Sequence, residues 1–186
     1  GCLLYRRFPY TRPFAFLLSG FTLLVAYLGQ MNPQITPLMP VLISPWLSYH
    51  VSLIMMSYAL FAFIWLNAVL SLFLSYRYPH ENEQVERLTI LSRLLLYPAT
   101  FLLGIGIILG SVWANESWGS YWSWDPKEVW ALVAFIIYGI PLHTQSMKCW
   151  RNTRTFHIYM FFAFFVILMT YFGVNYLLGG MHSYAN

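Results

Sequence analysis

The chain has 186 residues, of which 59% are hydrophobic and only 9% are charged. A chain of this composition has too little polar surface to cover a water-soluble globule, so an ordinary soluble domain is excluded and an integral membrane protein is predicted. The formal net charge of +4 therefore reports orientation in the membrane rather than binding to nucleic acid.

Five apolar segments follow one another along the chain. Each approaches or exceeds the roughly 20 residues that a helix needs to cross about 30 Å of hydrocarbon. We therefore predict an all-α integral membrane protein, a bundle of about five transmembrane helices that forms one domain over residues 1–186. Because the chain begins at Gly1 rather than at an initiator methionine, we expect it to be a piece of a longer polypeptide. The predicted spans are residues 14–29, 47–75, 94–112, 129–147 and 156–178.

Basic residues gather in alternate loops and so predict the orientation of the spans. Arginine and lysine are enriched on the cytoplasmic side of membrane proteins. They precede the first span and follow the second and the fourth, whereas only Lys127 is left for the opposite face. The amino end is therefore predicted inside, and residues 113–128 and the carboxyl end outside. The inner basic residues are Arg6, Arg7, Arg12, Arg77, Arg87, Arg93, Lys148, Arg151 and Arg154.

Local signals for helix starts and ends agree with these spans. The run Asp125-Pro126-Lys127-Glu128 is typical of a capping box with proline at the first helical position, so it predicts the start of the fourth helix. Helix capping is the favoured role of both acids over direct catalysis. Ser44-Pro45 predicts the start of the second helix in the same way, and Gly179-Gly180 fits the end of the fifth.

Aromatic side chains are concentrated between residues 113 and 130, at one predicted outer boundary. Scattered tryptophans at that depth would indicate an interfacial belt. Here the rings lie close together in the sequence, and Gly119, Ser120 and Ser123 leave room for a flat partner. The segment therefore predicts a binding surface for a flat aromatic ligand. Its rings are Trp113, Trp118, Tyr121, Trp122, Trp124 and Trp130.

Two histidines, His50 and His182, fall on the same predicted outer face as this segment. Haem iron takes histidine nitrogen as an axial ligand, whereas a lone interfacial histidine is usually only a hydrogen-bonding residue. The pair favours haem over zinc, which normally needs three or four ligands. Cys2 and Cys149 form neither a CxxC pair nor a CxxCH motif, so no disulfide framework or covalently attached haem is indicated.

His143 is predicted at a different depth, about 20 Å from the outer surface and in the inner half of the bilayer. Ionisable residues at such depth are functional candidates. A neutral imidazole hydrogen-bonded to a neighbouring helix is an equally weighted structural alternative. For His157, at the inner start of the fifth span near Arg154, anchoring at the interface is a sufficient explanation.

The stretch WANESWGSYWSWDPKEVWAL, residues 113–132, resembles the tryptophan-rich segment of the CcsA family, the haem-handling membrane subunit of system II cytochrome c synthases. Leu142-His143-Thr144 and the terminal YFGVN and GGMHSY runs match further motifs of that family. The resemblance implies that His50 and His182 are axial ligands of an external haem. It also implies that His143 ligates a membrane-embedded haem whose second ligand lies in a CcsB-like subunit or fused half. Gln145 and Ala185 depart from the family's usual arginine and glycine.

The resemblance further implies haem export and attachment of haem b to an apocytochrome c that carries a CxxCH motif. The enzyme would be a cytochrome c synthase component, active with its partner half, in the bacterial inner membrane or the thylakoid membrane. No general base is assigned. A system I type haem courier that forms no thioether bond is the alternative function, and a purely structural subunit is a third. The implied haem-contacting residues are Trp113, Trp118, Tyr121, Trp122, Trp124 and Asp125.

Overall fold

The computed structural model describes residues 13–20, 23, 44–78, 82–143 and 148–178. The chain divides into two compact units, residues 1–43 and residues 44–186. In the first unit, residues 13–20 are helical and lie at the start of the first predicted span. Half of that span, residues 21–22 and 24–29, lies outside the described residues.

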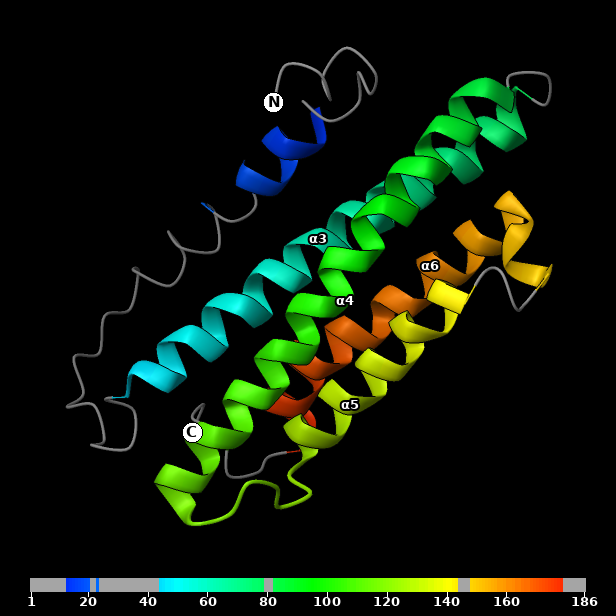
Figure 1. Ribbon diagram of the computed structural model, residues 1–186. Helices are drawn as coiled ribbons and strands as arrows, with labels where there is room; N and C mark the ends of the chain where they lie inside the picture. The colour runs from blue at the N-terminus through cyan, green and yellow to red at the C-terminus, as the bar shows by residue number, and fades with distance from the viewer. Residues whose placement is uncertain (1–12, 21–22, 24–43, 79–81, 144–147, 179–186) are drawn as a thin grey trace. The chain divides into compact units, whose positions relative to one another are not determined.

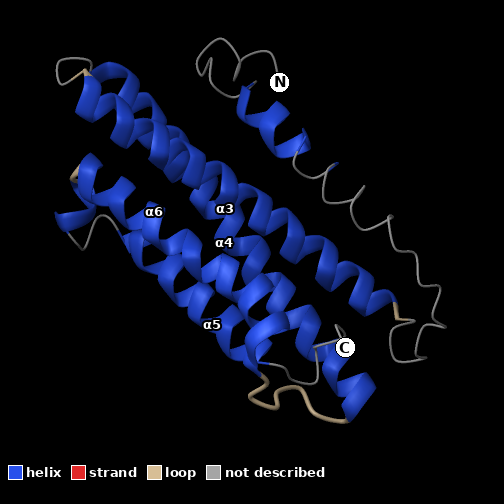
Figure 2. Cartoon of the chain, turned by 180° about the vertical axis from the view of Figure 1, so that it is seen from behind, coloured by secondary structure: helices blue, strands red, loops and turns tan. Residues whose placement is uncertain are grey.

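The second unit is a bundle of helices, and no strand occurs in its described part (Figures 1 and 2). This confirms the predicted all-α fold class. Helix α5 continues as a short 3-10 helix, and α6 continues as a π-helix. The elements are α3 (Pro45–Arg77), α4 (Asn82–Trp118), α5 (Pro126–Gly139), η2 (Ile140–His143), η3 (Lys148–Arg151), α6 (Thr153–Leu168) and η4 (Met169–Leu178).

The helices of the bundle alternate in direction. The Ser57 hydroxyl on α3 donates to the Ala99 carbonyl on α4 at 2.8 Å, and seven residues earlier on α3, His50 contacts the Gly106 carbonyl, seven residues later on α4. Helices α3 and α4 are therefore antiparallel. We call the end that holds Pro45, Trp118 and Pro126 the tryptophan end, and the end that holds Arg77, Asn82, His143 and Thr153 the arginine end (Figure 1).

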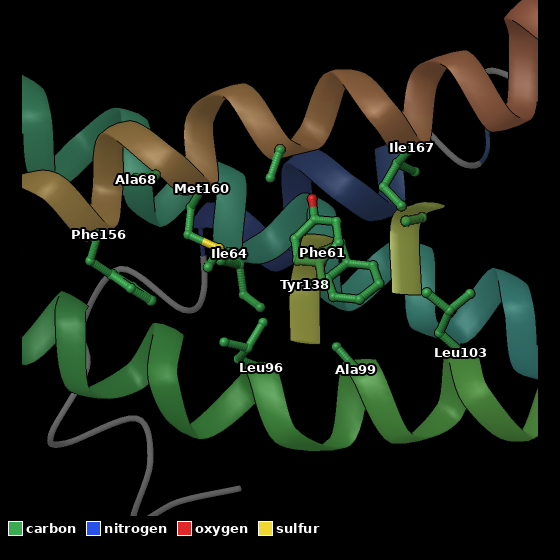
Figure 3. Close-up of a cluster of buried hydrophobic side chains, with 12 residues drawn as sticks. Phe61, Ile64, Ala68, Leu96, Ala99, Leu103, Tyr138, Phe156, Met160 and Ile167 are labelled. Carbon is green, nitrogen blue, oxygen red and sulfur yellow. The ribbon is translucent and has the colours of Figure 1, made fainter. Parts of the chain in front are cut away.

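All four helices contribute side chains to one apolar core (Figure 3). Near its middle the rings of Phe61 and Tyr138 stack, with centroids 3.7 Å apart. Other large apolar side chains, such as Phe101 and Phe162, face outward, as expected of helices whose solvent is lipid. The core residues are Phe61, Ile64, Ala68, Leu96, Ala99, Leu103, Ala134, Tyr138, Phe156, Met160, Ala163 and Ile167.

Three helices among the described residues are long and apolar enough to cross a membrane, namely Pro45–Arg77, Glu83–Trp118 and Thr153–Val174. They contain all or most of the second, third and fifth predicted spans. The third predicted span is part of α4, which begins at Asn82, twelve residues before the predicted start. Residues 82–93 are helical as well, and their apolar side chains Val85 and Leu88 are buried in the bundle. The fourth predicted span is helical over its described part, residues 129–143. Its α-helix ends at Gly139, where Pro141 has no N–H to continue the hydrogen-bond ladder.

Candidate functional site

His50 lies in the second turn of α3 and is partly buried against α4. Its Nδ1 atom is 2.7 Å from the carbonyl oxygen of Gly106. A carbonyl oxygen can only accept a hydrogen bond, so Nδ1 carries a proton and donates it. In the neutral ring this tautomer places the lone pair on Nε2. A backbone carbonyl that fixes the tautomer in this way is the usual partner of a metal-binding histidine.

Two of the predicted aromatic residues pack together where α4 ends. Trp113 is 1% exposed, and its ring contacts that of Trp118 edge to face, with centroids 4.8 Å apart and an interplanar angle of 68°. Trp118 is the last residue of α4 and is only partly buried. Trp113 therefore supports Trp118 from inside the bundle.

The loop between α4 and α5, residues 119–125, exposes other aromatic side chains of the segment. Gly119 adopts a φ of +74° and its N–H bonds to the Asn115 carbonyl, a glycine ending typical of helices. Beyond it, Tyr121 is 59% exposed and Trp124 is 72% exposed. The rings of Trp122 and Trp124 meet at 90° with centroids 6.0 Å apart. The loop thus presents aromatic faces outside the bundle.

Trp124 has a φ of +59°, a conformation that bulky residues rarely adopt. Glu128 holds it there from both sides. One carboxylate oxygen, Oε2, accepts the backbone N–H of Ser123 at 2.9 Å and the backbone N–H of Asp125 at 3.2 Å. The two amides flank Trp124 in the chain, so this carboxylate fixes the turn that carries the exposed indole.

The same carboxylate completes the predicted capping box of α5. The Asp125 side chain accepts the N–H of Lys127 at 3.1 Å, and the Glu128 side chain accepts that of Asp125. The capping role predicted for both acids is confirmed. Asp125 is buried, and its carboxylate caps the first turn of α5. Burial lowers the pKa of the Lys127 ammonium from its usual value, and Asp125 opposes that shift.

The first two turns of α3 add two aromatic residues that the sequence analysis did not single out. Trp46 is 39% exposed and Tyr49 is 61% exposed, and both lie at the tryptophan end. Ser44 is the N-cap residue and Pro45 opens the helix, as predicted, although the Ser44 side chain makes no cap hydrogen bond. In the sequence both residues lie between the predicted helix start and His50, and this position could have identified them as part of the site.

His143 lies at the arginine end, as the last residue of the 3-10 helix that follows α5. Its side chain is exposed, so it is not enclosed in the core of the bundle. Gly104, two residues from the His50 partner Gly106, packs against Phe135 in the third turn of α5. From Phe135, His143 is roughly 14 Å farther along the bundle axis, too far for His143 and His50 to ligate the same iron.

His182 and the predicted helix end at Gly179-Gly180 lie outside the described residues. The described chain ends at Leu178 in the π-helix. At the start of that helix the Thr170 hydroxyl donates to the Val166 carbonyl at 2.8 Å, and its oxygen lies 3.4 Å from the Trp130 carbonyl oxygen. Since Trp130 is in the second turn of α5, the chain leaves the described part at the tryptophan end.

His157 is not an interface anchor, and that interpretation is wrong. It is fully buried, and its Nε2 atom is 2.9 Å from the hydroxyl oxygen of Thr89. Because Thr89 donates its own proton to the Val85 carbonyl, the imidazole must donate to Thr89 through Nε2. The helical spacing of the apolar residues could have predicted this burial, since His157 is next to Phe156 and one turn from Met160 on the core face of α6.

The arginine end is also held by Arg93. Its guanidinium donates to the Trp150 carbonyl at 2.6 Å and lies 5.2 Å from the centre of the Phe156 ring. The side chain therefore joins α4 to the segment before α6. Like Arg93, the other described arginines lie at this end of the bundle, and they are Arg77, Arg87, Arg151 and Arg154.

Residues 7–182 match the protein family described as Cytochrome C assembly protein. The chain is 39% identical over 188 residues to Protein NrfI of Wolinella succinogenes, covering 98% of this chain and 21% of NrfI. It is 38% identical over 205 residues to the cytochrome c biogenesis protein CcsA of Mesostigma viride, covering 94% and 65%. For CcsA of Cyanophora paradoxa the identity is 35% over 213 residues, covering 88% and 66%. The chain therefore spans at most 66% of these relatives. It belongs to the cytochrome c assembly protein family, as a CcsA-type member.

Proposed function

We propose that the protein presents haem at the tryptophan end and takes part in attaching it to apocytochrome c, as the CcsA-type subunit of a system II cytochrome c synthase. One observation carries the proposal. The imidazole of His50, with Nδ1 bonded to a backbone carbonyl, lies at the same end of the bundle as the exposed aromatic loop. A metal-binding nitrogen and flat aromatic faces are what an iron porphyrin requires.

His50 and His182 are the proposed axial ligands of haem b, which is the substrate. The described chain ends at the tryptophan end at Leu178, four residues before His182 in the sequence. Because Nδ1 of His50 is bonded to Gly106, Nε2 is the nitrogen proposed to bind iron.

The aromatic loop is proposed to hold the porphyrin plane. Tyr121 and Trp124 supply exposed rings, Trp122 is partly exposed, and Trp118 is backed by the buried Trp113. Glu128 contributes by fixing the loop, and Asp125 by capping the helix that follows it. These residues bind and orient the substrate, whereas the reactivity resides in haem and thiols.

No acid or base of this chain is assigned to the attachment step. Each thiol of a CxxCH segment adds across one vinyl group of haem. The carbon–carbon π bond breaks, a carbon–sulfur bond forms, and the thiol proton ends on the neighbouring vinyl carbon, so no oxidant is consumed. The histidine of that segment replaces one enzyme ligand at iron, and the product can leave.

His143 is proposed to serve an earlier haem position, together with a ligand from a CcsB-like partner half. Its exposed side chain at the arginine end suits a ligand completed by another helix. The concentration of arginines there, with Lys127 at the other end, supports a cytoplasmic arginine end under the positive-inside rule. Haem would then travel from His143 toward the tryptophan end across the bacterial inner membrane or the thylakoid membrane.

The test uses the complete protein with its partner half, purified in detergent, with reduced haem and a CxxCH peptide. We expect haem to remain on the peptide after denaturation, while an AxxAH peptide retains none. Haem that binds and passes to the peptide without a covalent bond would instead indicate a courier. An absorption spectrum without bound haem, even after haem is added, would indicate a purely structural subunit.

A further inference from the structure

The surface of α4 that faces His50 is formed by two glycines one turn apart. Gly106 provides the carbonyl oxygen that accepts the Nδ1 proton. A Cβ atom on Gly110 would lie 2.7 Å from both Cε1 and Nδ1 of His50. Real Cβ atoms essentially never approach so closely, so the imidazole occupies the space that any other residue at Gly110 would fill.

The second glycine contact brings the backbones of α3 and α4 together at the same level. A Cβ atom on Gly106 would lie 2.6 Å from Cδ1 of Ile54, which is one turn beyond His50 on α3. Small residues allow this close approach of membrane helices. It is the close approach that brings the Gly106 carbonyl within hydrogen-bonding distance of the ring.

We propose that Gly106 and Gly110 are positioning residues for the iron ligand His50, and that the Gly106 carbonyl selects Nε2 as the nitrogen that binds iron. This inference rests on the proposed function. The carbonyl bond orients the ring and makes the ligating nitrogen more basic, and Gly110 leaves the ring the room it needs. Loss of such a supporting hydrogen bond typically weakens metal binding by about 10–100-fold.

The sharpest test removes the imidazole of His50 and leaves Gly106 and Gly110 unchanged. In the complete protein with its partner half, His50→Gly leaves a space that a free imidazole can fill. We expect 4-methylimidazole, which can bind iron and still donate an N–H to Gly106, to restore the low-spin haem spectrum. 1-Methylimidazole has the same size and can also bind iron, but it has no N–H. 1-Methylimidazole should therefore need a concentration about 10-fold higher than that of 4-methylimidazole, or more, to restore the spectrum equally.

Gly110→Ala tests the steric part, with Gly139→Ala as the matched control because a Cβ there meets nothing within 4 Å. We expect Gly110→Ala to raise the high-spin fraction of bound haem and Gly139→Ala to leave the spectrum unchanged. Added imidazole should reverse the effect of Gly110→Ala, which it would not do for a merely misfolded protein.

Each failure has a distinct meaning. If His50→Gly leaves the haem spectrum of the protein unchanged, the proposed function of His50 is wrong. If His50→Gly alters the spectrum but the two methylimidazoles restore it equally well, the role of the Gly106 carbonyl is overturned. If Gly110→Ala behaves like Gly139→Ala, Gly110 does not position the ligand.

Discussion

The two ends of the bundle use polar groups in opposite ways. At the arginine end, His157 and Thr89 are buried and bond to each other across two helices. At the tryptophan end, Glu128 bonds to backbone amides and leaves Trp124 exposed. The first arrangement fastens helices, whereas the second holds a surface open to another molecule. The comparison separates residues that stabilise the fold from residues that are available to a ligand.

The largest effect is expected when a buried and an exposed tryptophan at the tryptophan end are compared. Trp113→Ala removes a buried ring that packs on Trp118, and should lower the free energy of unfolding by about 3 kcal/mol. Trp124→Ala removes an exposed ring, and should weaken haem retention while leaving stability nearly unchanged. Unfolding in mixed micelles and haem titration measure the two quantities. If Trp113→Ala and Trp124→Ala lost equal free energy of unfolding, the distinction between a supporting and a surface tryptophan would be wrong.

Breaking the buried pair at the arginine end should come next. Thr89→Val leaves the N–H of His157 without its acceptor, which should cost about 1–3 kcal/mol of unfolding free energy. Replacing both partners, as in Thr89→Val with His157→Leu, should recover part of that loss because no buried donor is stranded. Haem bound at the opposite end should keep its spectrum in both variants. A changed spectrum would show that His157 serves the haem site.

Glu128→Ala should release the turn that holds Trp124. The variant removes the acceptor of two amides and should cost about 1 kcal/mol, as for the loss of a helix cap. Haem retention should fall more than this stability change explains, and Glu128→Gln, which keeps one acceptor oxygen, should fall between. Glu116→Ala, at an exposed acid near the end of α4, is the control. A haem affinity equal to that of Glu116→Ala would contradict the positioning role of Glu128.

The smallest effect is expected at the exposed ion pair of Glu83 and Arg87 at the start of α4. Both side chains are largely in solvent, so Glu83→Gln should change the free energy of unfolding by less than about 0.5 kcal/mol. The same unfolding assay measures it. If Glu83→Gln lowered the free energy of unfolding as much as Thr89→Val, exposed residues at the arginine end would contribute more to stability than their exposure indicates.

Much of the fold followed from local features of the sequence. Long apolar runs required membrane helices, and Pro45 and the run from Asp125 to Glu128 marked helix starts that the structure confirms. These signals are local because hydrogen-bond satisfaction at a helix end depends on a few neighbouring residues. The change from α-helix to 3-10 helix after Gly139 has a local cause too, since Pro141 has no N–H to continue the α-helical hydrogen bonds.

The placement of individual side chains depended on how the helices pack against one another. The sequence by itself determined the membrane setting, the helical class, the capping of α5 and the family resemblance, because composition, caps and motifs can be read along one chain. Only the tertiary structure decided that Trp113 is buried while Trp124 is exposed, that His157 is in the core, and that His50 bonds to Gly106. Those outcomes depend on which residue of a neighbouring helix lies opposite, and that register is set by the packing of the whole bundle.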